Sequence, residues 1–352
     1  LMAPEKLTTE QKLIWAYATY ILWGMAYTFV NIPYGSLATV MTQDPVERSK
    51  LSAARGVGGA FGAVIDRVIV PLFLVAYADS EAQGYLYAMA TLGVIAVLGY
   101  LVCYFTVSEN VQTTQDLDVK FTFRGTFGVL WKNRPFIAVS GASLAMIGGF
   151  MVSGTMTIYY FRENLDALNM MGLSGLTVIG PILLSAPLIP RLIARFGVKN
   201  TVSVSSLIGC MLYTILLLLP SNVYIYLIGT FISAICLTIP MMSLWGMVSD
   251  SIDYNQYLSG VRQEGVIYGA YSFVRKTAQA LAGFVAGSGL SIAGYSATAE
   301  TQSAETLAGI KFLALGTPAI GLLIASLIFH WLWNLTPEKQ KEVSEAISVS
   351  ST

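Results

Sequence analysis

The chain is short of charged residues for its length. Only 11% of its 352 residues are Asp, Glu, Lys or Arg, against about 25% in a soluble domain, whereas 55% are hydrophobic. The formal net charge is zero, which gives no electrostatic basis for binding a nucleic acid. These values exclude an ordinary soluble domain and predict an all-α, polytopic membrane protein embedded in a lipid bilayer.

Residues that commonly build catalytic or metal centres are scarce as well. The one histidine, His330, stands beside Trp331 near the end of the last apolar run, a position typical of the membrane interface. The three cysteines, Cys103, Cys210 and Cys236, lie far apart in apolar runs and form no CxxC pair. Metal-ligand clusters, a Ser/His/Asp set and a phosphate-binding glycine loop are missing, so the sequence predicts no enzyme, no cofactor and no bound metal.

Apolar runs that can cross a bilayer occur about nine times, at about 20 residues each. Their approximate bounds are 12–38, 52–78, 84–106, 135–160, 172–193, 200–220, 223–248, 265–290 and 307–333. A longer polar stretch divides the first three runs from the last six. We therefore predict four parts: a partial N-terminal bundle at 1–106, a central cytoplasmic loop at 107–134, a C-terminal six-helix bundle at 135–334 and a cytoplasmic tail at 335–352.

Lys and Arg gather on one side of these spans. The opposite side holds only Lys6, Lys12 and Arg162. The loops after odd-numbered spans, with the tail, hold Arg48, Lys50, Lys120, Arg124, Lys132, Arg134, Arg191, Arg195, Lys199, Arg262, Lys339 and Lys341. By the positive-inside rule, we expect a multi-pass protein of the plasma (inner) membrane with an external N-terminus and a cytoplasmic C-terminus.

The first span carries a polar stripe beside a proline. At about 100° per residue, Tyr20, Tyr27, Asn31 and Tyr34 fall within a sector of roughly 60°. Pro33 stands among them, where it frees a backbone carbonyl and allows a bend. Such a stripe indicates a face toward a cavity, or else a helix–helix contact made by tyrosine hydroxyls and one asparagine.

Charged residues inside apolar runs cost free energy to place in a membrane, so their presence indicates a functional role. In the second span, Arg55 and Asp66 share a glycine-lined face and lie about 16 Å apart along it. This face is suited to line a cavity in which Asp66 binds a cation or carries a proton. Alternatively, Asp66 and its neighbour Arg67 neutralise each other or charges on other helices.

The eighth span repeats this pattern. Ser272, Lys276 and Gln279 share one face of the predicted helix, with Tyr268 beside it. The stripe indicates a functional Lys276, and a structural ion pair inside the membrane is the alternative. Arg275 points elsewhere, and we interpret it as structural.

A charged connection follows the seventh span between residues 249 and 265. Asp250, Asp253 and Arg262 stand at the membrane edge, where ion pairs can form in one conformation and break in another. A solvated loop is the plainer alternative.

Two blocks and the tail of the sequence resemble one family of transporters. The first block reads Gly24-Met-Ala-Tyr-Thr-Phe-Val-Asn-Ile-Pro-Tyr-Gly-Ser-Leu37, followed by Gln43-Asp-Pro45, Glu47-Arg48 and Ala54-Arg55. The second block runs from Asp250 to Glu264 and on to Arg275-Lys276, and the tail is Leu335-Thr-Pro-Glu-Lys339. Over almost its whole length the chain is similar to the glycoside–pentoside–hexuronide:cation symporters of the major facilitator superfamily.

This resemblance implies a fold, a function and a set of site residues. The fold is a two-bundle transporter of twelve helices, here without the first three, that works by alternating access. The function is symport of a sugar or glycoside with Na⁺ or H⁺. The implied sites are Tyr27, Asn31, Arg55 and Lys276 for the substrate, Thr28 and Asn31 for the cation, to which the residue pattern adds Asp66, and Asp250, Asp253 and Arg262 for gating.

Departures from the family pattern keep other functions open. The helix that holds the cation-binding carboxylates of the family has no counterpart, and a member of the family has Asp at the position of Asn31. The chain is therefore a sugar transporter, a truncated membrane protein that transports nothing, or a transporter of the same fold for another solute such as a lipid or a drug.

Overall fold

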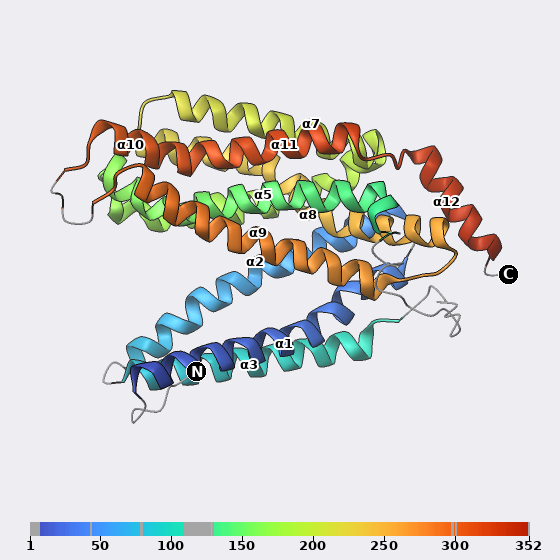
Figure 1. Cartoon of the computed structure of the whole chain (residues 1–352), viewed down its shortest axis with the longest axis horizontal. Helices are drawn as coiled ribbons and strands as arrows, with labels where there is room; N and C mark the ends of the chain where they lie inside the picture. Colours follow the sequence, from blue (N-terminus) through green and yellow to red (C-terminus); the bar gives the residue numbers. More distant parts are fainter. Residues whose placement is uncertain are drawn as a thin grey trace. The chain divides into compact units, whose positions relative to one another are not determined.

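The computed structural model describes residues 8–108, except 43, 78 and 79, and residues 128–350, except 129, 297, 298 and 300. These residues form helices and connections without any strand (Figure 1). The α-helices are α1 (Thr9–Met41), α2 (Pro45–Ala76), α3 (Glu81–Thr106), α5 (Arg134–Tyr159), α6 (Leu176–Ser185), α7 (Leu188–Leu218), α8 (Val223–Ser259), α9 (Glu264–Ile292), α10 (Ala304–Lys311), α11 (Thr317–Trp331) and α12 (Pro337–Ser350). Two π-helical segments, Tyr160–Asn164 and Phe312–Gly316, and a 3₁₀ segment, Leu168–Gly175, connect some of them.

Six helical stretches of the described chain are long and apolar enough to cross a membrane. They are Glu10–Leu37, Gln83–Thr106, Arg134–Asn164, Leu188–Leu218, Val223–Ser259 and Ala304–Trp331. The predicted all-α membrane class is therefore confirmed, whereas the number of about nine spans is not. The helices α2 and α9 are not among the six, and both carry charged residues along their length.

The chain divides into two compact units. The first comprises Leu1–Met41 and Gly58–Gln112, and the second comprises Thr42–Val57 and Thr113–Thr352. The beginning of α2 is therefore grouped with the second unit. Most of the loop predicted at 107–134 lies outside the described residues, so the domain bounds drawn from the sequence stay predictions.

In the first unit, α1 and α3 keep most of their apolar side chains on the surface. None of the apolar stretch of α1, and 6% of that of α3, is buried inside the protein. Aromatic rings make some of the contacts: Tyr34 meets Tyr100 edge to face at 5.7 Å, and Tyr77 stacks on Tyr87 at 4.9 Å. Exposed apolar side chains on a helix suit a lipid environment, because lipid tails cover them.

In the second unit, α5 and α11 approach each other at two glycines. A Cβ atom on Gly149 would overlap the carbonyl oxygen of Thr317, and one on Gly321 would overlap that of Ala145. Only glycine allows two helix backbones to come this close. The contact places α11 in the core, and 61% of the apolar stretch that contains it is buried. Figure 1 shows α5, α7, α8, α9 and α11 as the long helices of this unit.

The end of α8 differs from the sequence-based expectation. The helix continues to Ser259, so Asp250 and Asp253 lie on its last turns and not in a loop. It ends at Gly260, which has a left-handed conformation (φ 71°) and whose N–H donates to the carbonyl oxygen of Gln256. The expectation was wrong because the apolar run stops near residue 248, whereas buried polar side chains continue the helix against α12.

Two features near the end of α8 shape the site described below. Gly197, with φ 76° and ψ 164°, interrupts α7 at the turn between the fifth and sixth predicted spans. The predicted tail forms the helix α12, and the chain that leads to it is anchored by Trp333, which is fully buried and donates from its indole nitrogen to the carbonyl oxygen of Leu335 at 3.1 Å. The tail is thus packed on the second unit.

Candidate functional site

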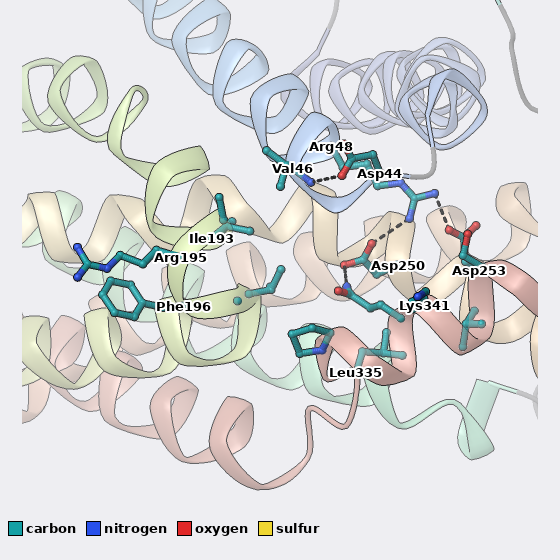
Figure 2. Close-up of a pocket in the computed structure, with 17 residues that line it drawn as sticks. Asp44, Val46, Arg48, Ile193, Arg195, Phe196, Asp250, Asp253, Leu335 and Lys341 are labelled. Carbon is teal, nitrogen blue, oxygen red and sulfur yellow. Dashed lines mark hydrogen bonds and ion pairs between the residues drawn. The ribbon is translucent and has the colours of Figure 1, made fainter.

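Arg48, in the first turns of α2, is the centre of a buried ion-pair network in the second unit. Its Nη1 lies 2.9 Å from Oδ1 of Asp250, and its Nη2 lies 2.5 Å from Oδ2 of Asp253 (Figure 2). Its Nε donates to the carbonyl oxygen of Thr42 at 2.9 Å. The two carboxylates stand three residues apart on α8, so one guanidinium can bridge them. Since the Arg48 side chain is only 3% exposed, the pairing holds two helices together in a protein interior.

A second arginine completes this network. Arg262 follows the end of α8, and its Nη1 lies 2.9 Å from Oδ1 of Asp253. Its Nε lies 3.5 Å from Oε2 of Glu264, at the start of α9. Asp253 is therefore shared by two arginines, and the network joins the beginning of α2, the end of α8 and the beginning of α9. The structure brings together the three residues predicted to act in gating, Asp250, Asp253 and Arg262.

The helix α12 closes the network from the other side. The Nε2 atom of Gln340 donates to the second oxygen of Asp250, Oδ2, at 3.0 Å. Around it, Tyr257 of α8 donates to Oε1 of Glu342 at 2.9 Å, and the Nζ of Lys339 reaches the same oxygen at 2.6 Å. The hydrogen bond from Lys339 lowers the pKa of the Glu342 carboxyl below its ordinary value. The end of α8 is thus held by α2 and α12 together.

An open cavity of about 700 Å³ adjoins the network. It lies among the beginning of α2, the interrupted part of α7, the end of α8 and α12, as Figure 2 shows. Arg48, Asp250 and Asp253 form part of its wall. Water therefore has a route to the edge of the ion pairs, which is what a network that opens and closes requires.

A second cluster surrounds Trp245, in the membrane-spanning part of α8. The guanidinium carbon of Arg55 lies 3.7 Å from the centre of the indole ring, and that of Arg275 lies 4.6 Å from it. Tyr268 stacks on the indole at 5.9 Å, and Tyr271 meets it edge to face at 5.9 Å. Two cations and two phenol rings thus contact one indole.

Three members of this cluster, Trp245, Tyr271 and Arg275, line a cavity of about 410 Å³ in the second unit. The volume falls within the range of about 300–1,000 Å³ that is common for small-molecule sites. Most of the lining is apolar, and Trp245, Tyr271, Arg275 and Gln279 provide polar groups. An apolar cavity with a few converging polar groups is suited to bind a small molecule.

The second unit contains two of the predicted substrate residues, Arg55 and Lys276, and the structure places only Arg55 against the Trp245 cluster. Arg55 contacts Trp245, and its Nη2 donates to the hydroxyl of Tyr268 at 3.0 Å. Lys276 has an exposed side chain and is not part of the described cavity lining, so its role stays a prediction. Arg275, which we interpreted as structural, lines the cavity instead. Adjacent positions on a helix point about 100° apart, so the rotation of α9 decides which of the two cations faces the cavity.

The other predicted site residues, Tyr27, Thr28, Asn31 and Asp66, belong to the first unit, and their roles stay predictions. Tyr27 stacks on Trp23 with ring centres 5.8 Å apart. Thr28 donates its hydroxyl to the carbonyl oxygen of Gly24 at 2.8 Å, and Asn31 is half-buried. The side chain of Asp66 lies outside the described residues.

Sequence reasoning missed several residues of the two clusters. The sequence identified Arg48 only as one of the cations in a loop. Its burial against two carboxylates depends on the packing of α2 on α8, which the sequence does not show. Trp245 stands alone in an apolar run, where an aromatic residue usually belongs to the core. A signal was available for Arg275, because it is spaced four residues from Gln279 and the two share a helix face.

The helical fold, the membrane spans and the two clusters define the class of the protein. It is a multi-pass membrane protein with a small-molecule cavity, and its described residues contain no group of side chains that could hold a metal ion. A family model described as MFS/sugar transport protein matches residues 1–336, so the chain belongs to this family of sugar transporters.

Relatives agree with this assignment. The chain is 34% identical to the uncharacterized symporter YjmB of Bacillus subtilis, over 98% of this chain and 75% of that protein. It is 32% identical to the glucuronide carrier protein homolog of Escherichia coli, over 94% of this chain and 72% of that protein. It is 29% identical to the isoprimeverose transporter of Lactiplantibacillus pentosus, over 96% of this chain and 72% of that protein. The predicted family is confirmed, and the chain is a membrane transporter for sugars and not an enzyme.

Proposed function

We propose that this transporter carries a sugar or glycoside across the plasma (inner) membrane together with Na⁺ or H⁺, by alternating access. The observation that carries the proposal is the buried network in which Arg48 joins α2 to Asp250 and Asp253 of α8. Buried ion pairs contribute little net stability, because desolvation of the charges offsets their attraction. They are, however, suited to a contact that forms in one state and breaks in another.

In this proposal Asp250, Asp253 and Arg262, with Arg48, close the transport pathway on the cytoplasmic side. The excess of Lys and Arg in the loops at this end supports the cytoplasmic assignment. When the network breaks, each charge becomes hydrated through the adjoining cavity of about 700 Å³, which offsets the lost ion pairs.

Substrate binding is assigned to the polar groups at membrane depth. Arg55 contacts Trp245 beside the cavity of about 410 Å³, and guanidinium and indole together match the hydroxyls and the flat apolar face of a sugar. Tyr27, Asn31 and Lys276 are the further substrate residues of the proposal. The names of two relatives, a glucuronide carrier homolog and an isoprimeverose transporter, support a glycoside as the cargo.

The coupling cation is assigned to Thr28, Asn31 and Asp66. Carboxylate, hydroxyl and amide oxygens are hard ligands of the kind that Na⁺ prefers, and a carboxylate alone can carry a proton. Neutralising Asp66 by the Asp66→Asn exchange is therefore expected to remove gradient-driven accumulation while leaving sugar binding in place.

Uptake into proteoliposomes tests the proposal. Radiolabelled glycosides are offered to the full chain with an inward Na⁺ gradient, with an inward proton gradient and with neither. We expect accumulation above the external concentration with one of the two gradients only. Accumulation of no glycoside under any condition would refute sugar transport, and equilibration that ignores both gradients would refute cation coupling.

A further inference from the structure

We propose that Arg275 is a specificity-determining residue and that, with Arg55 and Trp245, it selects glycosides that carry an acidic group, a carboxylate or a sulfonate. This inference rests on the proposed transport of a sugar and names the chemical class of that sugar. It concerns a residue that the family resemblance did not assign to the site.

The arrangement around Trp245 concentrates positive charge beside the cavity, with Arg275 in its lining and Arg55 against the same indole. Arg55 and Arg275 come from different helices, α2 and α9, and both guanidinium groups lie within 5 Å of the centre of the same ring, at 3.7 and 4.6 Å. A guanidinium that stacks on an aromatic face keeps its N–H donors at the edge, where they can bind a second group.

Arg275 is the member of the pair that faces the cavity. It is part of the lining, and in the described part of the chain it forms no ion pair within 4.0 Å. The described lining contains no Asp or Glu either. A cation in a mostly apolar wall is poorly solvated, so an anionic ligand gains more attraction there than it would in water.

Arg48 shows the contrast within the same unit. Its guanidinium is bound by Asp250, Asp253 and the Thr42 carbonyl, so each of its nitrogen atoms has a partner in the protein. The guanidinium of Arg48 is therefore occupied by groups of the protein, whereas Arg275 is placed to bind a ligand.

The chemistry of the cavity favours an acidic glycoside over a small inorganic anion. Carboxylates and sulfonates present two oxygens to the fork of a guanidinium, which permits paired hydrogen bonds. The rest of the lining, including Ile147, Phe150 and Ile182, offers apolar surface to the sugar face or to the group attached to it.

Family membership leaves this choice open. A glucuronide, named for one relative, carries a carboxylate, whereas isoprimeverose, named for another, is a neutral disaccharide. The charge at Arg275, and not the fold, is what would place this chain with the carriers of acidic sugars.

A pair of matched probes tests the inference by binding. 4-Nitrophenyl β-D-glucuronide and 4-nitrophenyl β-D-glucoside differ only in whether carbon 6 is a carboxylate or a hydroxymethyl group. Calorimetry on the full chain in lipid nanodiscs should show the glucuronide binding at least about ten-fold more tightly. The Arg275→Gln variant should lose most of its affinity for the glucuronide, and with it this preference.

Two variants serve as controls. Arg275→Lys keeps the charge without the planar fork, so it should retain part of the preference and also shows whether the site still folds. Arg162→Gln removes a cation from an exposed position with 60% of its side chain accessible, and it should leave the binding of both probes unchanged.

Equal affinity of the wild type for the two probes, binding of neither probe, or an equal loss of both affinities in Arg275→Gln would each overturn the inference. A chain that accumulates neutral glycosides along a gradient without charge preference would still be a sugar symporter. A chain that accumulates no glycoside at all would instead refute the proposed function.

Discussion

Arg48 and Asp250 stand 202 residues apart in the sequence and form a buried ion pair, with 2.9 Å between Nη1 and Oδ1. Their side chains are 3% and 6% exposed. The pair therefore ties the beginning of α2 to the end of α8 through a contact that is sensitive to the loss of either charge.

Removing one partner of this pair should cost much more than removing both. Arg48→Leu leaves Asp250 buried without a cation, and we expect the free energy of unfolding to fall by about 3–5 kcal/mol. The double variant Arg48→Leu/Asp250→Asn should recover part of that loss, since Asp253 keeps its pairing with Arg262. Chemical or thermal unfolding of the purified chain measures both values. Additive effects of the two exchanges would show that the residues are not coupled.

Gln340 should hold α12 on the end of α8. Gln340→Ala removes its hydrogen bond to Oδ2 of Asp250, at a cost of about 1 kcal/mol. Amide hydrogen exchange should become faster over residues 250–259 of α8 and over α12. Glu345→Gln is the control, because that side chain is 68% exposed and lies 3.9 Å from Lys341. If amide hydrogen exchange were equally fast in the two variants, Gln340 would not hold α12 on the end of α8.

Gly149 should be indispensable for the contact between α5 and α11, and its neighbour Gly148 should not. A Cβ at Gly149 would overlap the carbonyl group of Thr317, whereas one at Gly148 meets nothing within 4 Å. We expect Gly149→Ala to lower the free energy of unfolding by about 1–3 kcal/mol and Gly148→Ala to leave it almost unchanged. Thermal unfolding compares the two. A similar small effect in both would mean that α11 shifts to accept the methyl group.

Trp245 should contribute to substrate affinity through its contacts with two arginines. Trp245→Phe keeps an aromatic ring but weakens each cation–π contact, which is worth about 0.5–2 kcal/mol. We expect a glycoside to bind several-fold more weakly, because the smaller ring holds Arg55 and Arg275 less firmly beside the cavity, and we expect the free energy of unfolding to fall by about 0.5–2 kcal/mol. Trp331→Phe, at a residue 69% exposed, is the matched control. Calorimetry measures the glycoside affinity of both variants. An unchanged affinity in Trp245→Phe would show that the indole does not contribute to the binding site.

Much of the protein's class was predictable from the sequence because it depends on local properties. The length of an apolar run and the scarcity of charge indicate a membrane helix wherever the helix packs. The polar cluster of Asp250, Asp253 and Arg262 was recognisable for a similar reason, since the three residues lie close together in the chain. Its helical conformation was not, because buried polar residues and α12 extend α8 beyond the apolar run.

The sequence by itself determined the membrane class, the all-helical fold, the family and the neighbourhood of the charged cluster. Only the tertiary structure decided that Arg48 pairs with Asp250 and Asp253, and that Arg55 and Arg275 meet at Trp245. These contacts join residues from distant helices, and they depend on how far each helix is rotated about its axis. A rotation of about 100° exchanges Arg275 for Lys276 at the cavity, and the packing of α9 on its neighbours fixes that angle.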